Sequence, residues 1–367
     1  MHNWNDYLAS QGARHSPDDT SQAADFGHAL NVAQLSAGFV AVISDLGLIS
    51  VSGEDAASFL HKQLTNDVEH LGVDQARLAG YCSPKGRLQA TFLMWRNAES
   101  VFLQLPRELQ PALQKRLSMF VMRAKARLAD AGNLVVLGLG GAAAPAVLGQ
   151  HFAALPAAPY GKIDTGLGTL LRVADAFGSP RYQWLTTPAT ALAVLPSLRA
   201  VLALGGNQAW HLASIHAGVP QVGTRTHEQF VPQMINFELL GGVNFKKGCY
   251  PGQEIVARSQ YLGKLKRRAV LVTIATIDGV IAAPGDDVFA AADPGQPCGM
   301  VVNAAPNGAG GTDALVEIKL AALEAGQLAG QASDQAGREI ASIRLGSATG
   351  APLTLLAMPY PLDALEL

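Results

Sequence analysis

Short apolar runs separated by turn residues fill the last third of the chain. From Ala269 onward six such runs follow one another: VLVTI, DVFAA, GMVVNAA, ALVEIKL, EIASIRL and PLTLLA. Each is long enough for one strand, and the intervening segments are rich in glycine and proline, which interrupt regular structure. A series of closely spaced short strands is typical of a small antiparallel barrel or sandwich. We therefore predict a C-terminal antiparallel β-barrel over residues 269–367.

The first part of the chain mixes strand-like and helix-like patterns. Two β-rich runs, FVAVIS and GLISV, lie between Ala37 and Val51, and Ser52 follows as a possible helix start. Further strands and one helix are predicted at Tyr81, 87–95, 101–105 and 111–121. Helices that alternate with antiparallel hairpins indicate the α+β class. We place a first α+β unit at 30–132, after a polar lead-in over residues 1–28.

A second α+β unit is predicted over 133–245, and parts of it can interleave with the first. Its predicted elements are Leu134–Leu139, Ala142–Leu148, Leu170–Ala174, Tyr182–Leu185, Ala189–Leu202 and Ala209–Ala217. Residues 246–268 then form a linker with an unusual composition before the barrel begins. Ligand sites tend to form at joints between domains, so this linker is the first place to look for function.

Length and composition narrow the class of protein. A chain of 367 residues suggests two or three domains, and 49% apolar against 15% charged residues excludes wholesale disorder. With 27 basic and 29 acidic residues the net charge is −2, which argues against a protein that coats nucleic acid with its whole surface. Any site for a polyanion must therefore be local.

The cysteines and the N-terminus indicate the cellular compartment. The three cysteines, Cys82, Cys249 and Cys298, are an odd number without a CxxC pair, so neither a disulfide framework nor a resident metal site is expected. The N-terminus has no basic segment followed by an apolar stretch, and the uncharged segment 131–161 is interrupted by glycine and proline. These features predict a cytoplasmic protein without a membrane span.

The linker 246–268 concentrates positive charge. It contains seven basic residues and one acidic residue, Glu254. Such a strip can attract a multiply anionic ligand such as a polyglutamate, a phosphate or an RNA backbone, whereas a solvated basic loop is the simpler interpretation. The basic residues are Lys246, Lys247, Arg258, Lys264, Lys266, Arg267 and Arg268.

Cys249 lies within this strip, two residues after Lys247. Nearby cations favour a thiolate, and Gly248 and Gly252 allow close approach to the backbone, so a reactive thiol is one interpretation. A spectator cysteine is the other, because most lone cysteines are of that kind. A helix that begins near Gly252 would place Glu254 in its first turn, where an acid interacts favourably with the helix dipole.

The run FKKGCYPGQEIVAR, from Phe245 to Arg258, resembles the signature of the YgfZ-type folate-binding proteins, which are relatives of the glycine-cleavage T-protein, an aminomethyltransferase. The similarity extends to LISVSGEDAASFLHKQLTNDV at 48–68, to YCSPKGR at 81–87, and to Trp210. The positions that match the signature are Lys247, Gly248, Cys249, Tyr250, Gly252, Gln253, Glu254 and Arg258.

The resemblance implies a fold and a role. It implies a ring of three domains, two related ferredoxin-like α+β units and a β-barrel, around a cavity for tetrahydrofolate. It also implies an accessory role in the maturation or repair of iron–sulfur enzymes, including the enzyme that methylthiolates tRNA. Cys249 would then be the key catalytic residue, and the other signature positions together with Trp210 would bind folate. Folate and iron–sulfur client enzymes are the implied partners.

The chain departs from the T-protein where that protein uses an aspartate on the folate nitrogen. The corresponding segment, Ser83–Thr91, contains no carboxylate, and neither Arg87 nor Gln89 supplies the basicity of one. An aspartate-driven transfer is therefore disfavoured. A tetrahydrofolate-dependent aminomethyltransferase or demethylase remains the alternative function, and whether the protein is an enzyme stays open.

A second departure concerns the segment after Trp210. The related families tend to read R-x-E-A-G there, whereas this chain has Ser214 and His216 in the first and third positions. A neutral histidine accepts only one hydrogen bond and offers no negative charge to a pterin, so folate would bind differently, or His216 merely packs its helix. Trp210 and Tyr250 could stack on a pterin, although buried aromatic residues more often belong to a core.

A third hypothesis comes from another class of protein. The cluster from Lys264 to Arg268 can bind RNA, with an affinity that falls steeply as salt rises. It lacks the interleaved aromatic residues that stack on bases, and the rest of the chain is acidic. Direct nucleic-acid binding is therefore the least favoured of the three functions.

Overall fold

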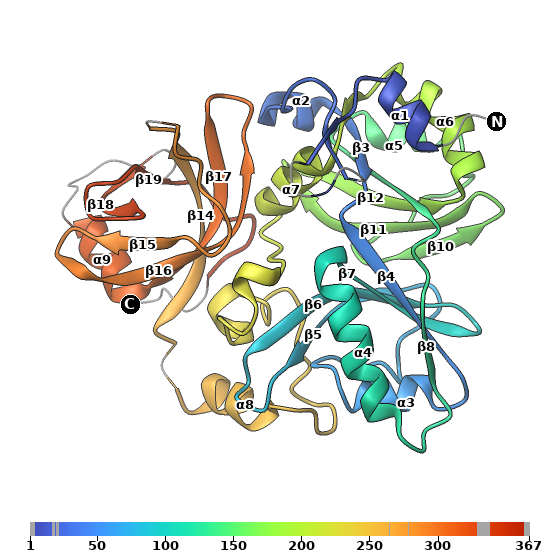
Figure 1. The fold of residues 1–367 in the computed structure, drawn as a ribbon, viewed down its shortest axis with the longest axis horizontal. Helices are drawn as coiled ribbons and strands as arrows, with labels where there is room; N and C mark the ends of the chain where they lie inside the picture. Colours follow the sequence, from blue (N-terminus) through green and yellow to red (C-terminus); the bar gives the residue numbers. More distant parts are fainter. Residues whose placement is uncertain are drawn as a thin grey trace. The chain divides into compact units, whose positions relative to one another are not determined.

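The computed structural model describes residues 4–16, 19, 22–263, 265–277, 279–328 and 338–362 (Figure 1). The α-helices are α1 (Trp4–Ser10), α2 (Val32–Ala37), α3 (Ala56–His61), α4 (Gln110–Val121), α5 (Ala144–Leu148), α6 (Pro188–Arg199), α7 (Asn207–His216), α8 (Gln253–Tyr261) and α9 (Leu320–Leu328). The first thirteen strands are β1 (Arg14–His15), β2 (Ala23–Asp25), β3 (Phe39–Ile43), β4 (Leu46–Ser52), β5 (Ala76–Cys82), β6 (Leu88–Arg96), β7 (Ser100–Pro106), β8 (Arg127–Asp130), β9 (Val135–Gly140), β10 (Lys162–Thr165), β11 (Gly168–Ala176), β12 (Ser179–Thr186) and β13 (Ala203–Gly205). The last six are β14 (Arg267–Ala275), β15 (Asp287–Ala290), β16 (Asp293–Pro306), β17 (Gly311–Lys319), β18 (Arg338–Leu345) and β19 (Pro352–Leu355).

The chain divides into two compact units, and the boundary passes within strands β5 and β6. Unit 1 contains Met1–Ala57, His70–Arg77 and Leu93–Ala217. Unit 2 contains Ser58–Glu69, Leu78–Phe92 and Gly218–Leu367. The division into three domains with a separate linker remains a prediction.

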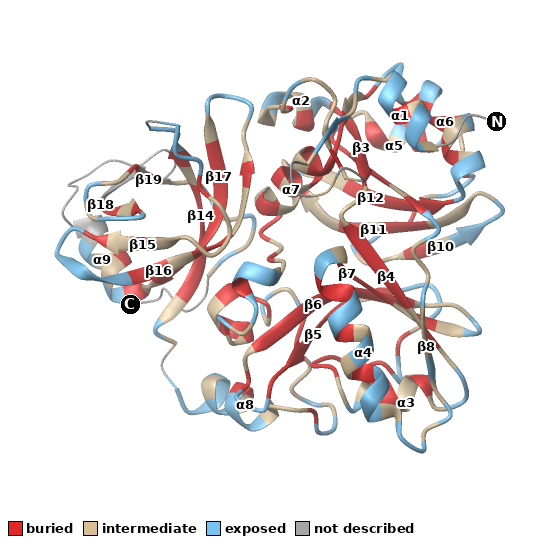
Figure 2. Ribbon diagram, in the orientation of Figure 1, coloured by how far each residue is buried: buried red, intermediate tan, exposed pale blue. Residues whose placement is uncertain are grey.

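A six-stranded sheet forms the centre of unit 1. Its order is β10-β11-β12-β9-β3-β13, and only the pairing of β13 with β3 is parallel. All five residues of β3 are buried, which matches a central strand covered on both faces (Figure 2). Helix α6 packs Leu195 and Leu198 into the core of this sheet. Strand β3 thus pairs with β9 and β13 in this sheet, whereas β4, the next strand along the chain, pairs with β7 and β8 in another sheet.

The polar lead-in that we expected over residues 1–28 is partly built into the fold. Helix α1 buries Leu8 and packs Trp4 and Tyr7 against the core of the six-stranded sheet. Strand β1 pairs with β2. The expectation of a loosely held segment was wrong for helix α1 because its large apolar side chains, Trp4, Tyr7 and Leu8, contact the core.

A five-stranded sheet, β5-β6-β7-β4-β8, follows the elements predicted for the first α+β unit. Strand β7 pairs antiparallel with β4 and with β6. Helix α4 begins at Gln110, with Pro111 in its first turn, where the missing N–H of proline costs nothing. The predicted helix over 111–121 and the strands before it are therefore confirmed.

The C-terminal strands close into a barrel of order β14-β17-β16-β15-β18-β19, and every pairing in it is antiparallel. Each of the six predicted apolar runs is one of these strands, so the predicted barrel is confirmed. Alternate residues of β14, including Val270, Val272 and Ile274, fill its core. Helix α9, which the pattern did not predict, adds Leu323 to that core.

None of the helices in the described part of the chain has the length and apolarity needed to cross a membrane.

Candidate functional site

The signature segment makes a sharp turn before helix α8. Gly252 has φ +79°, a left-handed conformation that side chains disfavour, and α8 starts at the next residue. The N–H of Gln253 donates to the carbonyl of Tyr250 at 3.1 Å, which tightens the turn. The predicted helix start near Gly252 is confirmed, with Glu254 exposed in the first turn.

Glycines hold this turn against the segment 83–87 of unit 2. A Cβ at position 252 would lie 2.4 Å from the carbonyl oxygen of Ser83 and 2.7 Å from the backbone of Gly86. Conversely, a Cβ at Gly86 would lie 2.9 Å from that of Ile255 on α8. Distances below 3.0 Å are too short for real side chains, so only glycines permit this approach. The resemblance-bearing segments FKKGCYPGQE and YCSPKGR therefore pack directly against each other.

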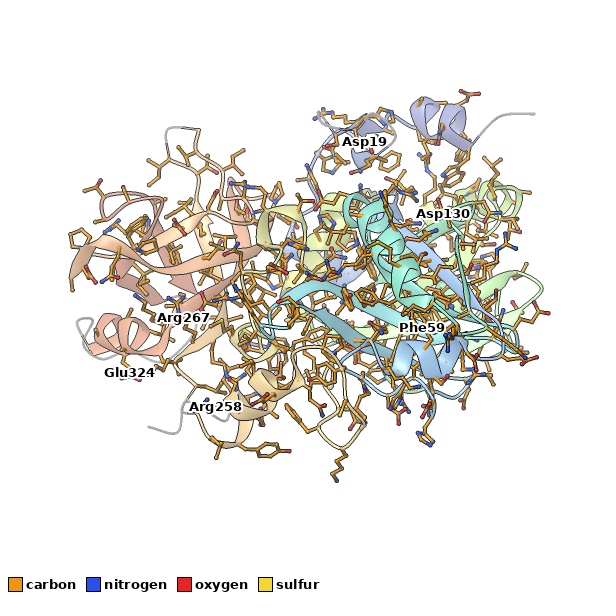
Figure 3. All side chains as sticks on the ribbon, turned by 60° about the horizontal axis from the view of Figure 1, so that its bottom comes forward. Asp19, Phe59, Asp130, Arg258, Arg267 and Glu324 are labelled. Atoms are coloured by element: carbon orange, nitrogen blue, oxygen red, sulfur yellow. The ribbon has the colours of Figure 1, made fainter. Side chains whose placement is uncertain are left out.

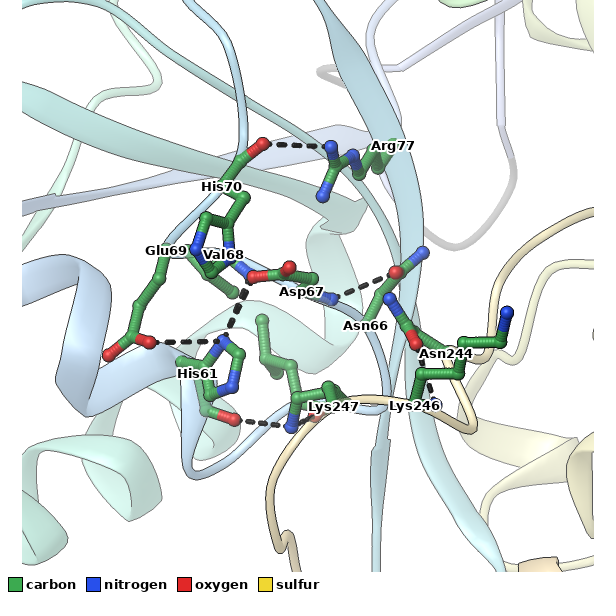
Figure 4. A network of polar contacts seen from close by, with 11 residues as sticks. His61, Asn66, Asp67, Val68, Glu69, His70, Arg77, Asn244, Lys246 and Lys247 are labelled. Atoms are coloured by element: carbon green, nitrogen blue, oxygen red, sulfur yellow. Dashed lines mark hydrogen bonds and ion pairs between the residues drawn. The ribbon is translucent and has the colours of Figure 1, made fainter.

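Lys247 ties the signature segment to the end of helix α3 (Figure 4). Its Nζ donates to the carbonyl oxygens of His61 and Leu64, at 2.5 and 2.9 Å. It also lies 4.9 Å from the centre of the Tyr250 ring. Burial lowers the pKa of Lys247 to about 8, and the carboxylates of Asp67 and Glu69 counteract part of that shift. The ammonium group thus holds the backbone at His61 and at Leu64, the two ends of a short loop.

His61 also faces the signature segment. Its Nδ1 lies 3.1 Å from Oδ1 of Asp67 and 4.0 Å from Oε2 of Glu69. The other ring nitrogen, Nε2, lies 3.8 Å from the position that a Cβ atom would occupy on Gly248. Position 248 is otherwise open, so a ligand or a partner can approach the backbone beside Cys249.

The three cysteines differ in accessibility. Cys249 is exposed, whereas Cys82 and Cys298 are buried. Burial raises the pKa of Cys82 to about 12 and also raises the pKa of Cys298, so both stay protonated thiols. Within the described ranges no three His, Cys, Asp or Glu side chains gather as a metal site would require. Cys249 is therefore the cysteine that can react with something outside the protein.

The remaining signature residues divide between the interior and the surface. Tyr250 is buried, and burial raises the pKa of its hydroxyl well above the usual range. Gln253 is half-buried, and Arg258 is exposed in the last turn of α8. Arg258 thus presents its charge to solvent close in sequence to the exposed Cys249.

The expectation of one cationic surface along 246–268 was wrong. Arg268 is buried and forms an ion pair with the buried Glu238, and its Nη1 also donates to the carbonyl of Gln233 at 2.9 Å. Arg267 is neutralised by Glu317, whose two oxygens both lie 2.8 Å from its Nη1. Lys246, Arg258 and Lys266 are exposed, while Lys264 lies outside the described residues.

Trp210 belongs to unit 1, on helix α7. It is buried, with the guanidinium carbon of Arg181 4.7 Å from its ring centre, and a Cβ on Gly138 would lie 2.3 Å from the ring. Arg181 also donates to Oγ of Ser214 at 3.1 Å. His216 packs its ring against Phe177, with ring centres 4.8 Å apart. Trp210 is therefore enclosed by the protein itself.

Sequence reasoning missed a carboxylate beside Gln89. The side-chain amide of Gln89 donates to Oε1 of Glu228, and Arg87 donates to the backbone carbonyls of Glu228 and Gln229. Glu228 has φ +58°, which is unusual for a residue with a side chain and marks a strained turn. No sequence signal announces this contact, because the partners are about 140 residues apart.

Comparison with solved structures identifies the class of fold. The crystal structure of glycine cleavage system aminomethyltransferase T from Bartonella henselae matches with a TM-score of 0.71. The match covers 96% of this chain and 95% of that chain, at 16% sequence identity. The protein therefore has the fold of the glycine-cleavage T-protein, as the sequence predicted.

Comparison with curated proteins identifies the family. The tRNA-modifying protein YgfZ of Cronobacter sakazakii is 33% identical over 251 residues, which are 67% of this chain and 74% of that protein. The protein of the same name from Escherichia coli O157:H7 is 32% identical over 231 residues, 63% of this chain and 70% of its own. No protein-family model matches the chain. The chain belongs to the YgfZ family, and the resemblance in the sequence is confirmed.

The predicted folate-binding residues match one part of tetrahydrofolate better than the other. The exposed cations Lys246, Arg258 and Lys266 suit the carboxylates of a glutamate tail. The aromatic residues suit the pterin less well, since Trp210 is buried under Arg181 and Lys247 lies over the ring of Tyr250. The donor set therefore fits the anionic tail of a folate better than its ring system.

Proposed function

We propose that this protein is a cytoplasmic folate-binding accessory protein that acts in the maturation or repair of iron–sulfur enzymes, including tRNA methylthiolation. The observation that carries the proposal is the exposed thiol of Cys249 on a backbone fixed from both sides. Gly252 packs against Ser83 and Gly86, and Lys247 holds the carbonyls of His61 and Leu64. A thiol presented in this way can act on a partner with little loss of conformational entropy.

The cysteine content favours a shared role rather than a resident cluster. The other two thiols are buried, so this chain offers Cys249 alone to a cluster or to a client enzyme. The remaining ligands would come from the client. Relatives that carry the name tRNA-modifying protein support a client that acts on tRNA.

Folate would bind through its negatively charged glutamate tail. Lys246, Arg258 and Lys266 would hold the glutamate carboxylates, and bound tetrahydrofolate would supply a one-carbon unit or its acceptor. Lys247 would position the signature backbone rather than bind the ligand, because its hydrogen bonds already go to two carbonyls. This changes the role that the sequence suggested for Lys247.

The thiol role is tested in a strain that lacks this protein. Cys249→Ser should fail to restore tRNA methylthiolation, measured by mass spectrometry of digested tRNA. Cys298→Ser is the matched control, since it makes the same atomic change at a buried site. It should restore the modification, provided that immunoblotting shows a normal amount of the variant protein in the cells. Full restoration by Cys249→Ser would disprove the thiol role.

The folate role is tested by titrating the purified protein with tetrahydrofolate that carries one or three glutamates. The triglutamate should bind more tightly, and Arg258→Gln should remove part of that advantage. Arg199→Gln, which removes an exposed charge at the end of α6, should leave both affinities unchanged. Equal affinity for both ligands would contradict the tail site, and absence of saturable binding to either would remove folate from the function.

One observation favours the alternative, a tetrahydrofolate-dependent aminomethyltransferase or demethylase. The segment 83–91 lacks a carboxylate of its own, but Glu228 supplies one beside Gln89. A carboxylate in this place can serve as a base. Turnover of tetrahydrofolate with an aminomethyl carrier or a methylated amine, lost in Glu228→Gln, would establish this function. No turnover with either substrate would exclude it.

A further inference from the structure

Unit 2 contains a cavity that the function proposed above does not use. Its volume is about 270 Å³, which is enough for a small organic molecule. It lies between the barrel and the segments that carry Arg87 and Phe230. Barrel strands β14, β15, β16 and β17 each contribute to the wall.

Two of the four charged residues in the wall neutralise each other. Glu317 is buried, and both of its oxygens accept from Nη1 of Arg267, which is labelled in Figure 3. Burial raises the pKa of Glu317, and Arg267 counteracts this shift. Lys319 and Arg87 also counteract the shift, so the guanidinium group of Arg87 interacts electrostatically with this pair.

The other two charged residues, Arg87 and Asp287, have opposite signs. Among the described residues neither forms an ion pair at short range, although Arg87 acts on Glu317 through space. Nη1 of Arg87 donates to the carbonyls of Glu228 and Gln229, which hold the guanidinium group in place. Asp287 differs from its neighbour Asp286, which is paired with Arg225 at 2.9 Å. A fixed guanidinium and a carboxylate in one wall are complementary to a ligand that carries both charges.

The rest of the wall is mainly apolar. Besides the polar Gln229, the uncharged lining residues are Phe230, Met234, Pro297, Gly299 and Met300. Methionines adapt to irregular apolar groups, so this part suits an aliphatic or thioether side chain. A phosphate dianion fits poorly, because two carboxylates line the same small space.

We propose that this cavity binds a small zwitterion with an apolar side chain, of the class of the apolar α-amino acids. The ligand's carboxylate pairs with Arg87 and its ammonium group with Asp287, while its side chain contacts Phe230 and the two methionines.

The test uses the purified full chain and equilibrium dialysis. The zwitterionic probes are L-leucine and L-methionine. Two analogues of leucine each lack one charge: 4-methylpentanoate lacks the ammonium group, and 3-methylbutylamine lacks the carboxylate. At least one of the amino acids should bind saturably below about 10 mM, and each analogue of leucine should bind about tenfold more weakly than leucine or worse.

Two variants make the assignment specific. Arg87→Gln should weaken leucine and 4-methylpentanoate by about tenfold and leave 3-methylbutylamine unchanged. Asp287→Asn should show the reverse selectivity between the two analogues. Arg199→Gln and Glu99→Gln, which remove exposed charges in unit 1, are the matched controls and should change nothing.

Three results would overturn the proposal. The first is no saturable binding of either amino acid, and the second is equal binding of leucine and its single-charge analogues. The third is the same loss for all probes in both variants, which would indicate a general disturbance of the fold rather than recognition of two charges. Thermal melting of each variant, compared with the wild type, accompanies the dialysis to identify that case.

Discussion

The cations at the two ends of the basic segment 246–268 have different partners. At the C-terminal end, Arg267 and Arg268 each meet a buried glutamate, Glu317 and Glu238. At the N-terminal end, Lys247 meets two backbone carbonyls and a tyrosine ring, and the exposed thiol of Cys249 follows two residues later. The C-terminal end is therefore a structural part of the barrel, whereas the N-terminal end exposes a thiol to solvent.

The difference shows that a run of cations in a sequence need not make a cationic surface. A buried guanidinium without a carboxylate would be very costly, so the fold supplies one from another part of the chain. Lys247 is only half-buried, and its ammonium group donates to two backbone carbonyls and not to a carboxylate. Burial lowers its pKa, and Asp67 and Glu69 counteract part of that shift. The following predictions test this contrast, beginning with the largest expected effect.

Arg268→Met should destabilise the protein most. It leaves the carboxylate of Glu238 buried without its partner, a situation that typically costs about 3–5 kcal/mol of unfolding free energy. Chemical denaturation measures the loss. The double variant Arg268→Met, Glu238→Met should recover much of it, because no unpaired charge is then left. A single variant as stable as the wild type would show that the pair does not hold the barrel to the 233–238 segment.

Gly252→Ala should cost about 1–3 kcal/mol, because the left-handed backbone is strained by a side chain and the new Cβ meets the carbonyl of Ser83. The matched control is Gly248→Ala, where the nearest atom to a new Cβ is 3.8 Å away. That control should stay within about 0.5 kcal/mol of the wild type. Similar losses for both variants would mean that the packing against 83–87 does not fix the signature segment.

Lys247→Met should cost about 1–3 kcal/mol at neutral pH, since two backbone carbonyls lose a charged donor. The pH dependence has a definite sign. The folded side chain has a pKa of about 8 and the unfolded one a pKa near 10.5, so between these values the unfolded state binds more protons. The stability of the wild type relative to Lys247→Met should therefore rise as the pH increases through this window. Denaturation at pH 7, 9 and 10.5 measures it, and a flat or falling difference would contradict the lowered pKa.

Cys249→Ser should have the smallest effect on stability, within about 0.5 kcal/mol, because the side chain is exposed. On the folded wild type, iodoacetamide should modify Cys249 alone, as read by peptide mass spectrometry. Cys82 and Cys298 should react only after denaturation, since both are buried. Modification of a buried cysteine at the rate of Cys249 would remove the contrast between the three thiols.

Several features of the fold could be predicted from local pattern. The six barrel strands, helix α4 and the start of α8 were predicted because their signals are local: apolar runs between turns, a proline in a first turn, and a glycine before a helix. Helix α9 was missed because its alanine- and leucine-rich sequence follows strand β17 with no turn signal between them. The family signature was likewise readable from the sequence, whereas the exposure of Cys249 was not predicted.

The sequence by itself determined the fold class, the family and the signature segment, because each depends on residues that are close together in the chain. Only the tertiary structure decided which charges remain available. Glu238 and Glu317 neutralise arginines that lie 30 and 50 residues away, and Glu228 meets Gln89 across 139 residues. The physical reason is that burial makes an unpaired charge costly, and the partner that removes this cost is chosen by proximity in space, which no local pattern encodes.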